Sequence, residues 1–305
     1  MSTQSNAMSE SFQSQSIAPA VIPATRVLYW SVRRELWENR SIYLAPLAVA
    51  AVALFGFSLS AIAGIWEKRL RLNPAEPQGP YDMAAGLMML TGIVVSVFYC
   101  VDALHSERRD RSILFWKSLP VSDLTTVLSK ASIPFVVLPL LIFVITVAMQ
   151  WIMLLLSSAV LLVSGQSVAA LWTNLSFLRM SLLLLYHILT AHALWPAPIY
   201  CWLLLVSGWP RRATFLWAAL PLVAIGGVEQ IVFHTWHFAA LVGSRLIGGG
   251  APTVASTSPD MFPTDPMTHV ALGRFLSSPG LWIGLAIAAA FLAAAVRLRR
   301  YQGPI

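Results

Sequence analysis

Residues 124–163 read LTTVLSKASIPFVVLPLLIFVITVAMQWIMLLLSSAVLLV, a run that is mainly apolar. An α-helix needs about 20 apolar residues to cross a bilayer, so this run is longer than one crossing requires. It contains Pro134 and Pro139, and a proline inside a helix removes a backbone hydrogen bond. We therefore expect a membrane-spanning helix that is kinked or that extends beyond the bilayer.

Other apolar runs share this character and, with residues 124–163, predict six transmembrane spans. Their approximate ranges are 41–65, 83–101, 175–207, 214–227 and 279–296. The composition agrees, because 57% of the residues are hydrophobic and 11% are charged, whereas a soluble domain has about 25% charged residues. Backbone polar groups in hydrocarbon must be satisfied within their own segment, which favours helices over a barrel. The predicted fold class is an all-α integral membrane protein.

The basic residues predict the orientation of these spans. If the N-terminus is cytoplasmic, most lysines and arginines fall on the cytoplasmic side, and the other side keeps Lys68, Arg69, Arg71, Arg179, Arg245 and Arg274. The positive-inside rule then places both termini in the cytoplasm, as in a multi-pass protein of the inner (cytoplasmic) membrane. The net charge of +7 is explained by this topology, so we expect no nucleic-acid partner.

The N-terminal residues divide into a tail and a helix. Residues 1–24 are rich in Ser, Gln and Ala and lack the pattern of a secretory signal, so we expect a disordered cytoplasmic tail before a single transmembrane domain over residues 25–305. Residues 25–41, TRVLYWSVRRELWENRS, predict an amphipathic helix along the inner leaflet. Helical spacing groups Val27, Trp30, Arg34 and Trp37, with Arg33 elsewhere around the helix. The alternative is a cytoplasmic extension of the first span.

Residues 107–123, ERRDRSILFWKSLPVSD, form the predicted cytoplasmic loop between the second and third spans. Four consecutive apolar side chains, at positions 113–116, are unfavourable in a loop that is surrounded by water. We therefore expect these side chains to be buried against another surface. We expect a short helix that Pro120 closes, with Ser122 and Asp123 capping the next one. Glu107 is expected to lie in water, and the helix to dock in a groove of a soluble partner. The alternative is a helix resting on the lipid interface.

The stretch ERRDRSILFWKSLPVSDLTTVLSK resembles the cytoplasmic loop of the membrane subunits of type-2 ABC exporters. The matching positions are Glu107, Arg108, Ser112, Ile113, Leu114, Leu119, Pro120, Val121, Ser122 and Lys130. Many members of that family have glycine at the position of Arg111. The layout is also similar: an amphipathic first helix, six spans, both ends inside, and an interrupted external segment before the last span.

This resemblance implies a permease subunit whose loop is a coupling helix for a separate cytoplasmic ABC ATPase, with two permeases and two ATPases in the working exporter. The docking residues would be Glu107, Arg108, Arg109, Asp110, Arg111, Ile113, Phe115, Trp116, Leu119 and Pro120. The interfacial helix would use Trp30, Arg33, Arg34 and Trp37. The chain lacks a phosphate-binding G-x-x-x-x-G-K-[ST] loop, so we expect no enzyme activity and no cofactor in this chain, with ATP and Mg on the partner.

The remaining polar residues bear on the alternatives. Carriers driven by a coupling ion need ionisable groups at bilayer depth, and the centres of the predicted spans contain no Asp, Glu, Lys or Arg. An ATP-independent channel or carrier is the second candidate, and a membrane-embedded hydrolase is disfavoured because its motifs are missing.

We expect His187 and His192 to be core or pathway-lining residues. Glu229, His234 and His237 resemble a zinc set, but an interfacial belt is favoured, so no metal site is predicted. The aromatic and Met-rich spans favour export of a hydrophobic or amphipathic compound.

Overall fold

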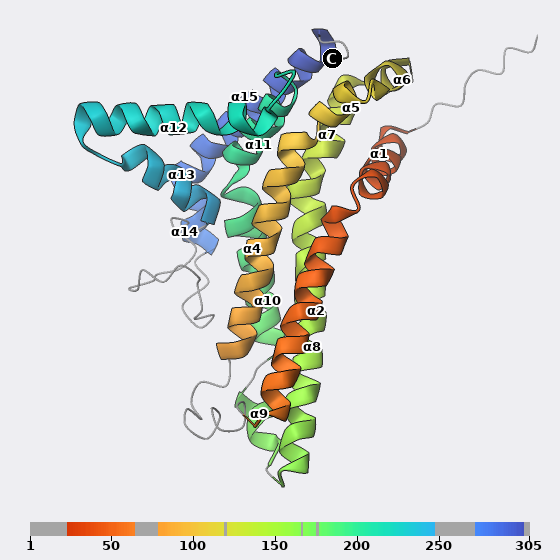
Figure 1. Cartoon of the computed structure of the whole chain (residues 1–305), viewed down its shortest axis with the longest axis vertical. Helices are drawn as coiled ribbons and strands as arrows, with labels where there is room; N and C mark the ends of the chain where they lie inside the picture. Colours follow the sequence, from red (N-terminus) through yellow and green to blue (C-terminus); the bar gives the residue numbers. More distant parts are fainter. Residues whose placement is uncertain are drawn as a thin grey trace, which may run out of the picture.

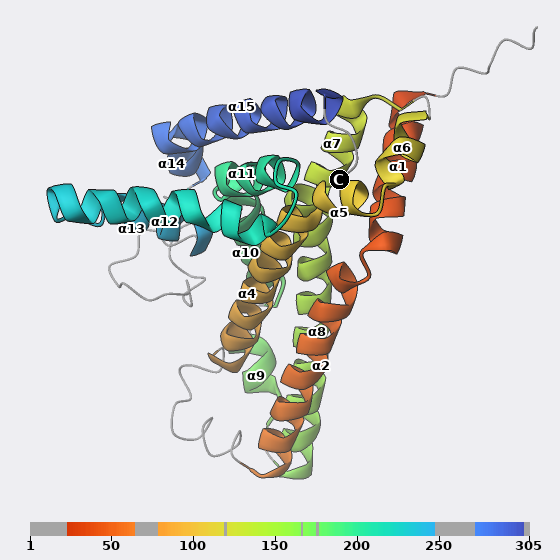
Figure 2. The ribbon, with the colours of Figure 1, turned by 45° about the horizontal axis from the view of Figure 1, so that its top comes forward.

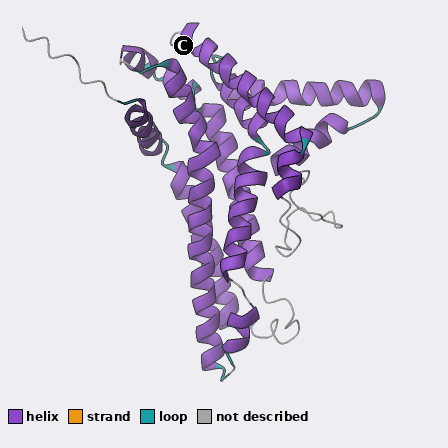
Figure 3. Cartoon of the chain, turned by 180° about the vertical axis from the view of Figure 1, so that it is seen from behind, coloured by secondary structure: helices purple, strands orange, loops and turns teal. Residues whose placement is uncertain are grey.

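The computed structural model describes residues 23–64, 79–118, 121–165, 167–174, 177–247 and 272–301. All regular elements in these ranges are helices (Figure 3). In chain order they are α1 (Ala24–Glu38), α2 (Ser41–Ile62), α4 (Gly79–Asp102), α5 (His105–Arg109), α6 (Ser112–Ser118), α7 (Asp123–Ser132), η1 (Ile133–Val137), α8 (Leu138–Val163), α9 (Ala169–Asn174), α10 (Phe177–His187), η2 (Ile188–Leu194), α11 (Ala197–Ser207), α12 (Thr214–Phe233), α13 (His237–Ile247), α14 (Leu272–Ser277) and α15 (Pro279–Tyr301). Residues 1–22 of the predicted tail lie outside the described residues.

The prediction of six long apolar helices is confirmed. Those long and apolar enough to cross a membrane are Ser41–Ile62, Gly79–Arg109, Asp123–Val163, Phe177–Leu194, Thr214–Phe233 and Pro279–Tyr301. The predicted span over residues 175–207 contains Pro196 and Pro198, which indicate a kink, and in the structure it divides at a turn formed by Trp195 and Pro196 between η2 and α11. Proline has no backbone N–H and does not continue the preceding helix.

The core of the bundle lies between α2, α4, α8 and α11 (Figures 1 and 2). Its centre is made of large, fully buried side chains such as Met88, Met149 and Met153. The contact between α11 and α15 is lined by the small buried residues Ala197, Cys201 and Ala288. Small side chains allow close approach of helices in a membrane, so α15 packs directly against the core.

Both long proline-containing segments carry a π-helical stretch. Pro134 lies in η1, and the following Pro139 lies at the start of α8. η2 ends at Leu194, and the Trp195 backbone N–H donates to the Thr190 carbonyl at 2.9 Å. π-Helical turns are rare and occur frequently at functional sites. The run 123–163 therefore stays helical through its prolines, with a local change of hydrogen bonding.

Helix α12 runs crosswise to α4 and extends away from the bundle, and the chain returns through α13 towards the bundle (Figures 1 and 2). The residues that flank α12, Ala213 before it and His234 after it, have φ values of 55° and 52°. Only Thr214, Ala218 and Gly226 of this helix are buried. The predicted fifth span is therefore an apolar helix, longer than predicted, that does not run alongside the others.

Arg245 on α13 connects the returning segment to the core. Its Nη1 donates to the Trp195 carbonyl at 3.2 Å, and its Nη2 donates to the Gly280 carbonyl at 2.6 Å. The guanidinium carbon lies 4.0 Å from the centroid of the Trp195 ring. A cation over a tryptophan face is attracted by the ring quadrupole. Arg245 thus ties α13 to α15 and to the turn before α11.

We expect Gly284→Ala to weaken this connection. A Cβ at Gly284 would lie 2.6 Å from Arg245 Nη1, so the guanidinium would have to move away from its two carbonyl partners. The cost comes from the hydrogen bonds that the displaced guanidinium loses, about 1.5–3 kcal/mol for a bond to a charged group, which thermal unfolding of the purified protein in mild detergent would detect. The control is Gly227→Ala on α12, where a Cβ meets no heavy atom within 4 Å. Equal unfolding midpoints for the two variants would contradict the role given to Arg245.

Candidate functional site

The loop after α4 forms two short helices, α5 and α6, at the end of the bundle where α1 and the last turns of α15 also lie (Figure 2). One helix was expected, but Asp110 and Arg111 interrupt it. Arg111 has a φ of 59°, a left-handed conformation that glycine adopts with least strain.

The start of α7 follows the expected capping pattern. The backbone N–H of Thr125 donates to Ser122 Oγ at 3.1 Å, which satisfies one of the free donors at the helix start. Asp123 lies in the first turn, where a negative charge is favourable. The capping prediction for Ser122 is confirmed. Leu119 and Pro120, predicted to end the preceding helix, lie outside the described residues.

Glu107 on α5 is the centre of a buried group of charges. Its side chain is 4% exposed and forms an ion pair with Arg299 Nη1. Its Oε1 lies 3.1 Å from Arg34 Nη2 and 3.2 Å from Lys130 Nζ. The expectation that Glu107 lies in water is wrong, because cations from α1, α7 and α15 converge on its carboxylate.

Glu35 on α1 is the second buried carboxylate. It is 0% exposed, and Lys130, which is 2% exposed, donates to both of its oxygens at 2.9 and 3.1 Å. The Tyr99 hydroxyl on α4 donates to Glu35 Oε2 at 3.0 Å. Lys130 is therefore shared between two carboxylates. We refer to Arg34, Glu35, Glu107, Lys130 and Arg299 as the charge cluster.

Arg299 brings the last helix into the charge cluster. Its Nε donates to Asp123 Oδ1 at 3.1 Å, and its side chain is 4% exposed. Asp123 begins α7, so one arginine of α15 contacts carboxylates of both α5 and α7. The cluster thereby joins the loop to α7, which follows it directly, and to α1 and α15, which are distant from it in sequence.

Arg34 connects the other members of the charge cluster to α6, the second helix of the loop. Burial lowers the pKa of its guanidinium, but Glu35, Glu38 and Glu107 outweigh that effect and the net pKa is raised. Burial is also the main reason that the pKa of Glu38 is raised, although Arg34 opposes the shift. The Arg34 guanidinium carbon lies 3.8 Å from the centroid of the Trp116 ring. The Arg34 side chain therefore contacts both Glu107 on α5 and Trp116 on α6.

The charge cluster stabilises the contact between the helices only while each of its charges has a partner of opposite sign. Removing one partner of a buried ion pair leaves an uncompensated charge and costs about 3–5 kcal/mol. Arg34, Lys130 and Arg299 face the carboxylates of Glu35 and Glu107. A displacement of α5 must therefore move or break ion pairs with α1, α7 and α15.

The predicted docking residues separate into buried and exposed groups. Glu107, Arg108 and Ile113 are buried, so in this conformation they anchor the loop instead of facing a partner. Arg108 Nη1 donates to the carbonyls of Gly208 and Trp209 after α11. The exposed group consists of Arg109, Asp110, Arg111 and Phe115, while Trp116 is half-buried; Leu114, which was not among the predicted docking residues, is exposed beside Phe115. Exposure, not residue type, decides which of these side chains can meet a partner.

The predicted N-terminal helix is present as α1, but its faces differ from the prediction, and its position at a membrane interface stays a prediction. Arg33 is exposed beside Trp30 and Trp37, whereas Arg34 faces the charge cluster. Sequence reasoning missed the roles of Glu35, Tyr99 and Arg299. The one available signal was a glutamate directly after two arginines in a helix otherwise rich in aromatic residues.

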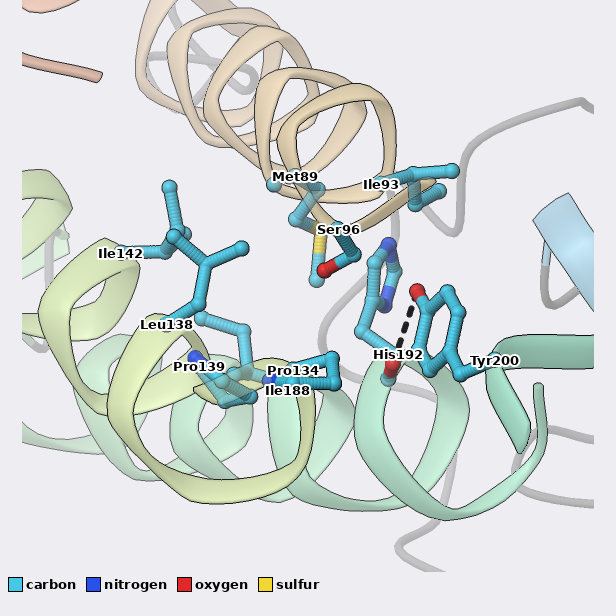
Figure 4. A pocket seen from close by; sticks show the side chains of 11 residues that line it. Met89, Ile93, Ser96, Pro134, Leu138, Pro139, Ile142, Ile188, His192 and Tyr200 are labelled. Carbon is cyan, nitrogen blue, oxygen red and sulfur yellow. Dashed lines mark hydrogen bonds between the residues drawn. The ribbon is translucent and has the colours of Figure 1, made fainter. Parts of the chain in front are cut away.

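A small pocket lies between the two π-helical stretches and α4 (Figure 4). His192, Tyr200 and Ser96 lie on one side of it, with Leu138 and Ile142 on the other. The Tyr200 hydroxyl donates to the His192 carbonyl at 3.4 Å. His192 Nδ1 is buried and makes no hydrogen bond with the described residues. The pocket has room for about one water molecule; it stays a prediction that His192 lines a pathway.

Glu229 has a capping role in the structure. Its carboxylate accepts hydrogen bonds from the backbone N–H groups of His237 and Phe238, both at 2.8 Å, and from the Thr235 hydroxyl at 2.9 Å. These donors belong to the start of α13 and the turn before it. In the described part of the chain, no three His, Cys, Asp or Glu residues are grouped as metal ligands.

Comparison of the chain with protein-family models, with curated proteins and with solved structures gives no match. The findings up to this point describe a multi-pass membrane protein with six candidate spans and a buried charge cluster at one end of its bundle.

Proposed function

We propose that this protein is the permease subunit of an ATP-driven exporter similar to type-2 ABC exporters. It would act as a homodimer with a separate cytoplasmic ATPase, in the cytoplasmic membrane and with both termini inside. The observation that carries the proposal is an exposed, partly apolar loop surface anchored to the helices by a buried charge cluster.

The docking surface consists of Arg109, Asp110, Arg111, Leu114 and Phe115. Leu114 and Phe115 are 58% and 59% exposed, beside exposed charges. Large apolar side chains with charged neighbours are typical of sites that bind a protein partner. Phe115 packs edge to face on Trp116 with ring centroids 5.0 Å apart, so its ring is already held in one orientation.

The charge cluster supports a mechanical link from the docking surface to the spans. A push on α5 by the ATPase would act on Glu107, and through Lys130 and Arg299 on α7 and α15. Because α7 continues into α8 through η1, a motion of α7 reaches the bundle without crossing a loop. The ATPase would bind ATP and Mg, and this chain would form the translocation pathway.

The composition of the spans supports an external energy source and an apolar cargo. In the described spans, Asp, Glu, Lys and Arg occur towards the ends of the helices and are missing from their middle parts. A carrier driven by a coupling ion needs such groups at depth. A hydrophobic or amphipathic cargo suits the aromatic and methionine side chains, and the export direction follows from the family resemblance.

An ATP-independent channel or carrier is the second candidate, because His192 is a buried ionisable residue beside a pocket. Vesicles containing this chain alone distinguish the two functions. Transport of an amphipathic dye without any ATPase would favour the second candidate. Transport that requires both the ATPase and ATP would favour the first.

Phe115→Ala is expected to weaken the binding of the ATPase. Truncating an interface hot spot costs at least about 2 kcal/mol, or roughly 30-fold in affinity. The measurement is the ATP hydrolysis that co-purifies with a tagged permease from native membranes, normalised to permease abundance. The matched control is Tyr29→Ala on α1, since Tyr29 is 60% exposed and Phe115 is 59% exposed. Normal co-purified hydrolysis with Phe115→Ala would place the ATPase contact elsewhere.

A further inference from the structure

The outward face of α1 carries alternating arginines and tryptophans. Arg26, Trp30, Arg33 and Trp37 follow one another at intervals of three and four residues, which places them on one side of α1, and Arg40 follows in the turn before α2. We call these residues the arginine–tryptophan stripe. Its tryptophans are 50% and 70% exposed, and its arginines are exposed as well.

Arg33 at the centre of the stripe is held by aromatic rings. Its guanidinium carbon lies 5.1 Å from the centroid of Trp30 and 5.4 Å from that of Trp37. The neighbouring Arg34 instead faces carboxylates of the charge cluster. In the described residues, no ion pair involves Arg26, Arg33 or Arg40. The positive charges of these three arginines are therefore not neutralised by an ion pair among the described residues.

The opposite face of α1 fixes the direction of the stripe. Glu35 is fully buried and is bound by Lys130 and Tyr99. A rotation of α1 that buried the stripe would expose this carboxylate and break those bonds. The stripe is thus held away from the bundle.

The stripe lies directly before the first apolar span. Arg40 is followed by α2, whose outward residues Leu44 and Leu47 are 54% and 49% exposed. Exposed leucines on a membrane-spanning helix face lipid tails. The end of the stripe is therefore next to the boundary between hydrocarbon and water, where tryptophan side chains are enriched.

We propose that the arginine–tryptophan stripe binds the phosphate headgroups of anionic phospholipids. Arginine matches phosphate oxygens with two parallel hydrogen bonds. Anionic lipids attract basic residues near the surface by about 1 kcal/mol each, or about fivefold per residue. The tryptophan rings hold Arg33 in place at the headgroup level. This inference goes beyond the proposed function and does not depend on an ATPase partner.

Lipid selectivity of the full chain tests the proposal. The protein is reconstituted in phosphatidylcholine vesicles that contain either spin-labelled phosphatidylglycerol or spin-labelled phosphatidylcholine, and the immobilised fraction of each label is measured. We expect a preference for phosphatidylglycerol that falls with added salt, because screening shortens the reach of exposed charges. The triple variant Arg26→Gln, Arg33→Gln, Arg40→Gln should lose that preference. Arg33→Gln alone should reduce the affinity of the stripe for phosphatidylglycerol about fivefold.

Arg109→Gln is the control, since Arg109 is an exposed arginine on α5. It should keep the preference shown by the unaltered protein. An unchanged preference in the triple variant, an equal loss in Arg109→Gln, or a preference that salt does not weaken would each overturn the proposal. So would competition by inorganic phosphate at low concentration, because the stripe would then bind a soluble anion. The single variant Arg33→Gln keeps the test decisive if the triple variant is unstable, because Arg33 is exposed and forms no ion pair with the described residues.

Discussion

Glu107→Lys is expected to destabilise the protein severely. The new ammonium group would lie beside Arg34, Lys130 and Arg299 in a site where Glu107 is 4% exposed. Removing one partner of a buried ion pair costs about 3–5 kcal/mol, and adding a like charge increases that cost. We expect the variant to lose most of its folded, monodisperse fraction in mild detergent, as measured by thermal unfolding and size-exclusion chromatography.

Asp110→Lys is the matched control for this experiment. It makes the same charge change three residues later in the loop, at a side chain that is 62% exposed and paired only with the equally exposed Arg109. Surface substitutions of this kind change stability by less than about 0.5 kcal/mol. If both variants unfolded at the same temperature, Glu107 would not be the buried centre of the charge cluster.

Arg299→Gln has the second largest expected effect. The substitution leaves Glu107 and Asp123 without their shared cation, while Glu107 stays buried between α5 and α15. We expect a loss of about 3–5 kcal/mol. We also expect faster proteolysis of the loop after Glu107, because α5 loses its attachment to the last helix.

Arg300→Gln separates the effect of this contact from a general loss of basic charge. Arg300 is adjacent in sequence and exposed, so its substitution should leave unfolding and proteolysis unchanged. A second comparison uses Arg299→Gln combined with Glu107→Gln. If the destabilisation comes from an unpaired carboxylate, the double variant should recover part of the stability lost in the single one.

The sequence predicted the helices better than their arrangement. Hydrophobic length identified all six long apolar helices, because desolvation in hydrocarbon constrains the residues themselves. Pro196 and Pro198 indicated a kink, but hydrophobic length alone did not show that the chain forms a separate short helix, α11, after the turn, since apolar residues continue on both sides of it. The crosswise direction of α12 was also hidden. A helix that is apolar on every side gives no pattern that indicates which neighbour it will contact.

The site was predicted in part. The loop residues from Glu107 to Trp116 were identified as helical and important, but Glu107 was placed in water. Its partners are separated from it by long stretches of chain, such as the 192 residues to Arg299, and local spacing carries no information about such pairs. On α1, Arg33 and Arg34 fit the helical period almost equally well. Only the burial of Glu35 decides which of them turns inward.

The order of synthesis gives the ion pair between Glu107 and Arg299 a further consequence. Arg299 follows every other member of the charge cluster in the sequence, and a ribosome makes the N-terminal residues first. Until α15 emerges and inserts, the carboxylate of Glu107 lacks one of its cations, and α5 has no attachment to the last span. A nascent chain that stops before this point retains an incompletely neutralised loop. The ion pair between Glu107 and Arg299 can therefore form only after α15 has been synthesised.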